Sequence, residues 1–436
     1  FPSFPPFPPF PPSPGAHLAS QPASMPHSRP APRLSGHLPA LDGLRGLAIL
    51  LVLTEHFVRL QPTTLVERLV SRGAAVGWVG VDLFFALSGF LITGILLEAK
   101  GGERFFRNFY LRRAFRIFPL YYGYLLLVFI GVPHLSGLAA GETRELLHTQ
   151  GWYWSYLSNV LIARTGSWAA TPLATLHFWS LAVEEQFYLV WPLVVWLLPR
   201  RRLKTVCLGA LLGSLAIRLT LRALGEPGVV LYVLTPTHLD PLAAGAWLAL
   251  VAREPGGLEW LKARVGPALA LGLAGIAAIM LTAHGPVVDA PAMQSVGYPL
   301  LALTCAALLA GGLTGRDSSP LGRLWRSKAL GFFGRLSYGL YVLHPLLLVL
   351  VVDWGYDVPW FAQRAGSQLL GQAVFAGLMT ALAAGVALVS WYAWEQPFLR
   401  LKSRFPMRAP VRKGGKDGKV VAVPRNTESV DRELVS

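Results

Sequence analysis

Charged residues are scarce in this chain. Only 14% of its 436 residues are Asp, Glu, Lys or Arg, whereas soluble domains carry roughly 25%. Hydrophobic residues make up 53%, which is typical of a protein that crosses a membrane many times. The net charge is +16, and in a membrane protein such an excess indicates basic cytoplasmic loops rather than nucleic-acid binding. We therefore expect a lipid bilayer, and no nucleic acid, as the partner of most of this chain.

Cysteine is almost absent. The two cysteines, Cys207 and Cys305, both lie in apolar segments. They match neither a metal-ligand spacing nor a disulfide framework. The sequence therefore predicts neither redox chemistry nor a metal site.

Helix-forming sequence is missing at the beginning of the chain. Residues 1–36 open with FPSFPPFPPFPPSPG, and no helix survives that proline density. This stretch also shows no signal-peptide core. We predict a disordered proline-rich leader at 1–36, a transmembrane domain at 37–400 and a disordered basic cytoplasmic tail at 401–436.

Long apolar runs fill the middle of the chain. Each run is near the length that crosses a bilayer, which predicts an all-α bundle of about ten transmembrane helices. The runs are at about 39–60, 76–97, 117–133, 177–198, 203–222, 229–251, 266–284, 293–313, 333–352 and 369–394.

Lysine and arginine gather in alternate connections between these runs. The connections at 98–116, 199–204, 252–265 and 314–332 are basic, whereas those between them carry few cations. Basic loops stay in the cytoplasm, so we predict that both termini are cytoplasmic in a multi-pass protein of the cell (inner) membrane. The aromatic and basic connection 98–116 is expected to lie in the membrane interface.

The first apolar run carries ionisable groups that are costly in hydrocarbon, and such groups mark functional sites. The spacing of Arg45 and His56 corresponds to about 1100° of helical rotation, within roughly 20° of whole turns, and about 16 Å of rise. The two side chains should therefore line one wall of a cavity. Arg45 is expected near the cytoplasmic end and His56 in the outer half of the membrane.

Other intramembrane polar groups are predicted at the same depth as His56. They are Asp82, Glu184, Asp240 and His344. Together these groups predict a cavity with a basic inner mouth, which would attract a polyanion, and a histidine among carboxylates in its outer half. A histidine beside an acid could act as a general base on a hydroxyl group.

At these positions the chain resembles the acyltransferase-3 family of integral-membrane acyltransferases. The resemblance covers about 37–400 and is carried by several motifs in order. They are Arg45 and His56 within LDGLRGLAILLVLTEH, then GVDLFFALSGFLI from Gly80, the basic pair Arg113 and Arg116, WSLAVEEQFY from Trp179, and SYGLYVLHP from Ser337.

The resemblance implies transfer of an acyl group, usually acetyl from acetyl-CoA, to a hydroxyl group of a glycan, glycolipid or exported small molecule. Under this hypothesis the donor phosphates would meet cofactor-binding residues Arg45, Arg113 and Arg116. The expected catalytic residues are His56, as base or transient acyl carrier, with Glu184 and Asp82 to orient it or bind the acceptor. Expected substrate-binding residues are Tyr341, His344 and Asp240.

Other interpretations stay open at this point. Buried His, Asp and Glu would also suit a secondary transporter, although no repeated halves are visible in the hydropathy. A glycan-export partner without catalysis is a further alternative. Individually, His56 could be a packed bundle histidine, and the arginines could be interfacial anchors. His177, at the outer end of a run, is expected to be interfacial.

Overall fold

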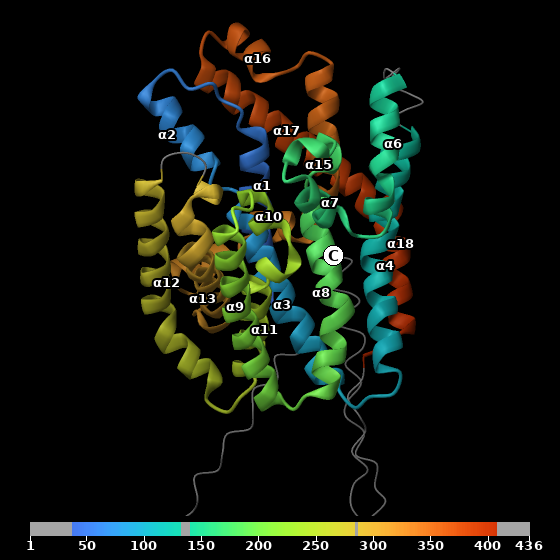
Figure 1. The fold of residues 1–436 in the computed structure, drawn as a ribbon, viewed down its shortest axis with the longest axis vertical. Helices are drawn as coiled ribbons and strands as arrows, with labels where there is room; N and C mark the ends of the chain where they lie inside the picture. Colours follow the sequence, from blue (N-terminus) through green and yellow to red (C-terminus); the bar gives the residue numbers. More distant parts are fainter. Residues whose placement is uncertain (1–36, 132–139, 284–286, 408–436) are drawn as a thin grey trace, which may run out of the picture.

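The computed structural model describes residues 37–131, 140–283 and 287–407. Within these ranges the chain is helical and has no strand, which confirms the all-α prediction. The long helices run roughly parallel to one axis and form a bundle (Figure 1). The predicted leader at 1–36 and the tail beyond Met407 lie outside the described residues.

Helices of 17 residues or more make up the body of the bundle. They are α1 (Pro39–Phe57), α3 (Val79–Ala99), α4 (Phe105–Leu126), α8 (Phe178–Leu197), α9 (Arg200–Ala223), α12 (Gly257–Thr282), α13 (Tyr298–Thr314), α15 (Lys328–Asp353) and α17 (Gln368–Ser390). Shorter helices are α2 (Leu65–Ala74), α6 (Ala140–Trp154), α7 (Ser158–Thr165), α10 (Gly228–Val233), α11 (Asp240–Val251), α14 (Pro320–Trp325), α16 (Val358–Ala365) and α18 (Gln396–Leu401).

Seven helical stretches among the described residues are long and apolar enough to cross a membrane. Helices α1 and α8, which were predicted to cross, are not among the seven. Both carry ionisable residues, such as Arg45 in α1 and Glu184 in α8. The predicted continuous span at 229–251 is wrong. Helix α10 ends at Val233, and α11 begins only at Asp240. Pro236 and Pro241, which lack a backbone N–H, accompany this break.

Two predicted boundaries also differ from the structure. The segment 98–116 is not a loop throughout, because α4 already begins at Phe105. At the other end, helical structure continues past the predicted boundary at 400, to Arg404. The Asn108 side chain donates a 2.9 Å hydrogen bond to the Pro406 carbonyl, which holds this end against α4.

Lys100 joins the turn between α3 and α4 to the end of α8. Its Nζ donates to the carbonyls of Val195 and Leu198, at 2.7 and 2.6 Å. A cation at a helix C-terminus satisfies carbonyls that have no partner within the helix. Burial lowers the pKa of Lys100, and the positive charge of Arg200 adds to this effect.

Glycines allow two helix pairs to pack with their backbones in contact. A Cβ on Gly334 of α15 would lie 1.9 Å from the Asp42 carbonyl oxygen of α1. A Cβ on Gly245 of α11 would lie 1.9 Å from the Ala86 carbonyl oxygen of α3. Small residues at helix crossings are the usual route to tight packing in membranes. These crossings fix the positions of α1 and α3, which carry site residues.

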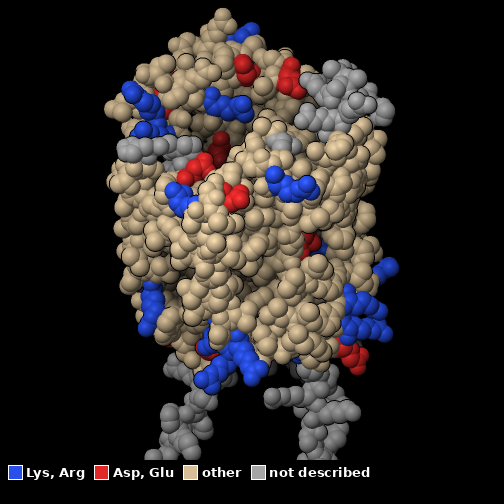
Figure 2. Space-filling model, viewed as in Figure 1, with Lys and Arg blue, Asp and Glu red and all other residues tan. Residues whose placement is uncertain are grey.

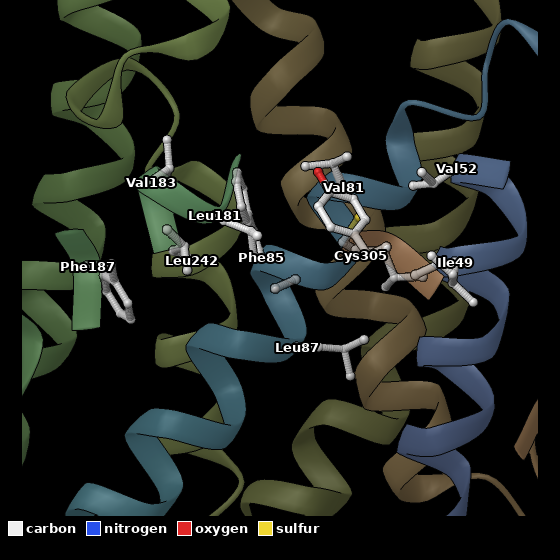
Figure 3. Packing of buried hydrophobic residues seen from close by; sticks show 14 of the residues in the cluster. Ile49, Val52, Val81, Phe85, Leu87, Leu181, Val183, Phe187, Leu242 and Cys305 are labelled. Carbon is white, nitrogen blue, oxygen red and sulfur yellow. The ribbon is translucent and has the colours of Figure 1, made fainter. Parts of the chain in front are cut away.

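Helix α3 lies in the middle of the apolar core. Figure 3 shows Phe85 and Leu87 of α3 among side chains from α1, α8, α11 and α13, with Val52 and Leu242 on either side. The face of the molecule seen in Figure 2 is almost uncharged across its middle, and its lysines and arginines gather toward both ends. This distribution agrees with a band of the surface that faces lipid.

Candidate active site

A cavity opens between α1, α3, α4, α8 and α15. It has about 760 Å³ of empty space, including its open mouth. The lining combines charged and hydroxyl side chains with aromatic and aliphatic ones. It consists of Arg45, Val81, Phe84, Phe85, Leu87, Ser88, Arg113, Arg116, Ile117, Ser180, Leu181, Glu184, Tyr188, Ser337, Tyr338 and Tyr341. The cavity therefore brings together five of the predicted site residues: the three arginines, Glu184 and Tyr341.

The arginines line one part of this cavity. Arg113 and Arg116 lie one turn apart on α4 and both face the cavity, as their spacing predicts. The guanidinium of Arg113 lies 6.0 Å from the centre of the Tyr188 ring. Arg45 enters from α1, where its Nη1 lies 3.7 Å from Asp42 Oδ1. Three guanidinium groups in one partly closed space make a strong site for phosphate groups.

A second cavity adjoins the first through Arg113. It is lined by Ile95, Glu98, Phe109, Arg112, Arg113, Lys402 and Met407, and has about 620 Å³ of empty space. Arg112 donates to the Lys402 carbonyl at 2.9 Å, which ties α4 to the turn after α18. Arg113 is therefore the shared wall of two basic spaces. An extended polyanion could contact cations in both.

Glu184 lies in a short hydrogen-bonded chain on the cavity wall. The Ser88 hydroxyl donates to Glu184 Oε1 at 2.6 Å, and the Tyr188 hydroxyl donates to Ser88 at 2.9 Å. Helices α3 and α8 supply these three residues. The hydrogen bond from Ser88 orients the Glu184 carboxylate, and this carboxylate makes no such bond to His56. The geometry therefore does not favour a role for Glu184 in orienting His56.

Three buried or half-buried histidines lie beyond Tyr341. The ring centre of His344 lies 4.9 Å from that of His56 and 5.6 Å from that of His177. Tyr341 lies 6.0 Å from His344 and 5.2 Å from His177. We call His56, His177, His344 and Tyr341 the histidine cluster. Because Tyr341 also lines the cavity, the cluster adjoins the arginine-lined space, although His56 itself is not part of the lining.

Backbone carbonyls fix the tautomers of two of these rings. His56 Nδ1 lies 2.9 Å from the Val52 carbonyl, and His344 Nδ1 lies 2.9 Å from the Leu340 carbonyl. A carbonyl oxygen only accepts, so Nδ1 carries the proton in both rings and Nε2 carries a lone pair. His56 therefore presents a basic nitrogen without help from a carboxylate.

Asp82 and Asp240 lie in a different cluster. Asp82 Oδ1 is 3.0 Å from His238 Nε2, and Asp240 Oδ1 accepts from Arg218 Nη2 at 3.0 Å. All four side chains are at most 2% exposed. Arg218 also donates to the carbonyls of Thr237 and Gln294. We call Asp82, His238, Asp240 and Arg218 the Arg218 network. Asp82, which was predicted to orient His56 or to bind the acceptor, is paired with His238 instead, and Asp240, which was predicted to bind substrate, is paired with Arg218.

Sequence reasoning missed three residues of these clusters. Arg218 could have been identified from the sequence, because it is a charged residue inside the apolar run 203–222, and intramembrane charges mark functional or structural sites. His238 lies in the run 229–251, two residues before Asp240, and received no site role from the sequence. His177 was expected to be interfacial, yet it is 4% exposed, because Tyr124, Tyr341 and His344 surround its ring. No residues in the described part of the chain form a histidine, cysteine or carboxylate group suited to a metal ion.

The basic cavity could attract an anionic substrate, and the neighbouring imidazoles could accept a proton. A family model for an acyltransferase domain matches residues 38–394, and the chain therefore belongs to the acyltransferase-3 family. No solved structure matches the chain.

The curated relatives are described as O-acetyltransferases. A putative peptidoglycan O-acetyltransferase YrhL of Bacillus subtilis is 32% identical over 74% of this chain and 51% of its own length. The peptidoglycan O-acetyltransferase OatA of Listeria monocytogenes is 29% identical over 72% of this chain and 50% of its own length. The O-acetyltransferase OatA of Staphylococcus aureus is 28% identical, with 72% and 51% covered. The chain thus spans about half the length of the relatives it matches.

Proposed function

We propose that this chain is a membrane-embedded O-acyltransferase that moves an acetyl group from acetyl-CoA to a hydroxyl group of a cell-envelope glycan or glycolipid. The observation that carries the proposal is that one cavity is lined both by Arg45, Arg113 and Arg116 and by Tyr341, whose ring lies 6.0 Å from that of His344 in the histidine cluster. Membership of an acyltransferase family and the names of the relatives support the reaction class.

The donor site in this proposal is the arginine-lined part of the cavity. Coenzyme A carries several phosphate groups, and arginine pairs with phosphate oxygens through two parallel hydrogen bonds. The second cavity adds Arg112 and Lys402 beside Arg113, so a long polyanionic ligand finds cations over its length. The thioester end would then lie toward Tyr341, away from the phosphates.

The chemical step in this proposal uses the lone pair of His56. His56 Nε2 takes the proton of the acceptor hydroxyl while the hydroxyl oxygen attacks the thioester carbon. The carbon–sulfur bond then breaks, and the coenzyme A sulfur leaves as a thiolate. The imidazolium of His56 returns its proton to that sulfur, so the products are an acetyl ester and the free thiol. The Val52 carbonyl holds the other ring proton on Nδ1 throughout, so Nε2 is the atom that takes and returns the transferred proton.

The proposed arrangement in the membrane follows from the placement of basic residues. We propose that both termini and the basic connections face the cytoplasm, that about ten segments cross or enter the inner membrane, and that acetyl-CoA enters from the cytoplasmic side. The acceptor would reach the histidine cluster from the other side. Because the relatives' names mention peptidoglycan, glycan strands of the envelope are the first acceptor to test.

The test uses the full chain, purified into lipid nanodiscs, with radiolabelled acetyl-CoA and soluble peptidoglycan fragments. We expect label in alkali-labile esters on the fragments, together with release of free coenzyme A thiol. A transporter or an export partner would give neither product, and that result would overturn the proposal. Mass spectrometry of envelope glycans from cells with and without the protein should show the same gain of acetyl groups. Longer acyl-CoA donors in the same assay test the preference for acetyl.

A further inference from the structure

His177 is a buried ring whose nitrogens lack partners. Its side chain is 4% exposed, and neither Nδ1 nor Nε2 makes a hydrogen bond of standard geometry within the described part of the chain, although the backbone of Val342 lies close to the ring. His344, which is fully buried, likewise has no partner at Nε2. A buried polar atom without a partner costs about 1–3 kcal/mol, and native structures almost always supply water or a ligand at such atoms. Several such atoms close together indicate a place where a polar group binds.

The backbone of His177 is held in place by two hydroxyl groups. Tyr341 and Ser180 both donate to the His177 carbonyl at 3.0 Å, and the two hydroxyls are also in contact with each other. The residue immediately precedes α8, and its ring packs 4.2 Å from the ring of Phe178. These contacts fix the ring without using either nitrogen. They also use both hydroxyl protons, so Tyr341 and Ser180 have none left to donate to a substrate.

A count of hydrogen-bond donors separates His177 from the other two rings. The N–H of His56 and that of His344 each go to a backbone carbonyl, so each ring offers only a lone pair at Nε2. His177 in either neutral tautomer retains one free N–H and one lone pair. Within the histidine cluster as described, His177 is therefore the ring that can donate a hydrogen bond.

Acyl transfer needs such a donor. When a hydroxyl oxygen attacks a thioester carbon, negative charge develops on the carbonyl oxygen, and a lone pair cannot stabilise it. We propose that His177 is a catalytic residue that donates its free N–H to the acyl carbonyl oxygen, while His56 Nε2 receives the hydroxyl proton. His344 lies between them, and its Nε2 accepts a hydrogen bond from the bound acceptor. This inference rests on the proposed function.

The test compares two substitutions of His177 in nanodiscs with acetyl-CoA and peptidoglycan fragments. His177→Phe keeps a ring but removes the donor, and we expect kcat to fall by about 10²–10³. His177→Gln keeps an N–H donor, and we expect it to retain kcat to within about tenfold of wild type. The Kd of a non-reactive thioether analogue of acetyl-CoA should stay the same in both variants, because the arginines bind the donor. His148→Phe, at an exposed histidine of α6, is the matched control.

Thermal unfolding distinguishes chemistry from packing. Because neither nitrogen of the His177 ring makes a hydrogen bond of standard geometry to the described residues, we expect His177→Phe to unfold at a temperature no lower than that of wild type. Equal loss of kcat in both His177 variants, or a lower unfolding temperature with proportionate loss of activity, would show that the ring only packs. Full activity of His177→Phe would also overturn the proposal. If the wild type transfers acetyl groups and His177→Phe transfers them equally fast, only this inference fails. If the wild type itself shows no transfer, the proposed function fails.

Discussion

Two buried polar clusters lie within this bundle, and they differ in how their hydrogen bonds are satisfied. In the Arg218 network, Arg218 bonds to Asp240 and to two backbone carbonyls, and Asp82 bonds to His238 through Oδ1, although Asp82 Oδ2 has no partner among the described residues. In the histidine cluster the rings face one another, and three of their nitrogens have no protein partner among the described residues. Side chains held by an ion pair and several hydrogen bonds stay in one conformation, whereas a ring with neither nitrogen paired can bind something else.

The surroundings of the two clusters sharpen this contrast. The Arg218 network joins α9 and α11 to α3, and none of its members lines either cavity. The histidine cluster joins α1, α8 and α15, and it meets the arginine-lined cavity at Tyr341. We therefore expect damage to the first cluster to appear as lost stability, and damage to the second as lost turnover in a folded protein.

The largest expected effect comes from breaking the ion pair in the Arg218 network. Arg218→Met keeps the side-chain volume but leaves Asp240 buried without its cation, which should cost about 3–5 kcal/mol. The thermal unfolding midpoint in detergent measures this loss. Asp240→Asn in the same background should recover most of it. An unchanged midpoint for Arg218→Met would mean that the pair contributes nothing.

Loss of one cavity arginine should weaken donor binding. Arg116→Ala removes a charge-assisted contact worth about 1.5–3 kcal/mol, so we expect the Kd of an acetyl-CoA thioether to rise by about 10- to 100-fold. Calorimetric titration of the nanodisc protein measures that Kd. The matched control is Arg335→Ala, which removes an exposed arginine of α15. Equal effects of the two substitutions would argue that bulk charge, not the cavity, attracts the donor.

A methyl group at the α1–α15 crossing should affect both stability and turnover. Gly334→Ala places a carbon 1.9 Å from the Asp42 carbonyl oxygen, so α1 must shift away from α15, at a cost of about 1–3 kcal/mol. His56 and His344, which lie on these two helices, would separate. Gly331→Ala is the control, because the nearest atom to its new carbon lies 3.8 Å away. Unfolding midpoint and kcat should fall together only for Gly334→Ala.

The smallest expected effect lies in the second cavity. Lys402→Ala removes one cation from its lining, and a partly solvated pair is worth about 0–1 kcal/mol. We expect the KM for acetyl-CoA to rise by roughly threefold at low salt, and the difference from wild type to vanish in high salt. A salt-independent effect would place Lys402 in a structural role.

The sequence predicted much of the arginine-lined cavity. The spacing of Arg113 and Arg116 placed them together on one helix, and the family motifs brought Arg45, Glu184 and Tyr341 to the same space. Helical spacing along one segment survives folding because it depends only on the geometry of that helix. The catalytic and binding roles of these residues stay predictions until they are measured.

The pairing of the other polar residues could not be read from the sequence. Asp82, Asp240 and His56 were expected at similar depths, and depth alone does not say which helices are neighbours. Packing at the Gly245 crossing turns α3 toward α11, so Asp82 meets His238 instead of His56. The burial of His177 likewise depends on Tyr341 and His344, which lie far away in the chain.

The most direct measurement compares His56→Ala with His238→Ala in the acetyl-transfer assay, with turnover expressed per folded molecule. The two histidines are similar in chemistry but belong to the two different clusters. We expect His56→Ala to fold normally and lose transfer by about 10²–10⁴-fold, and the folded fraction of His238→Ala to keep turning over. This account would be contradicted if His56→Ala still transferred acetyl groups. It would also be contradicted if only His238→Ala lost transfer while remaining folded.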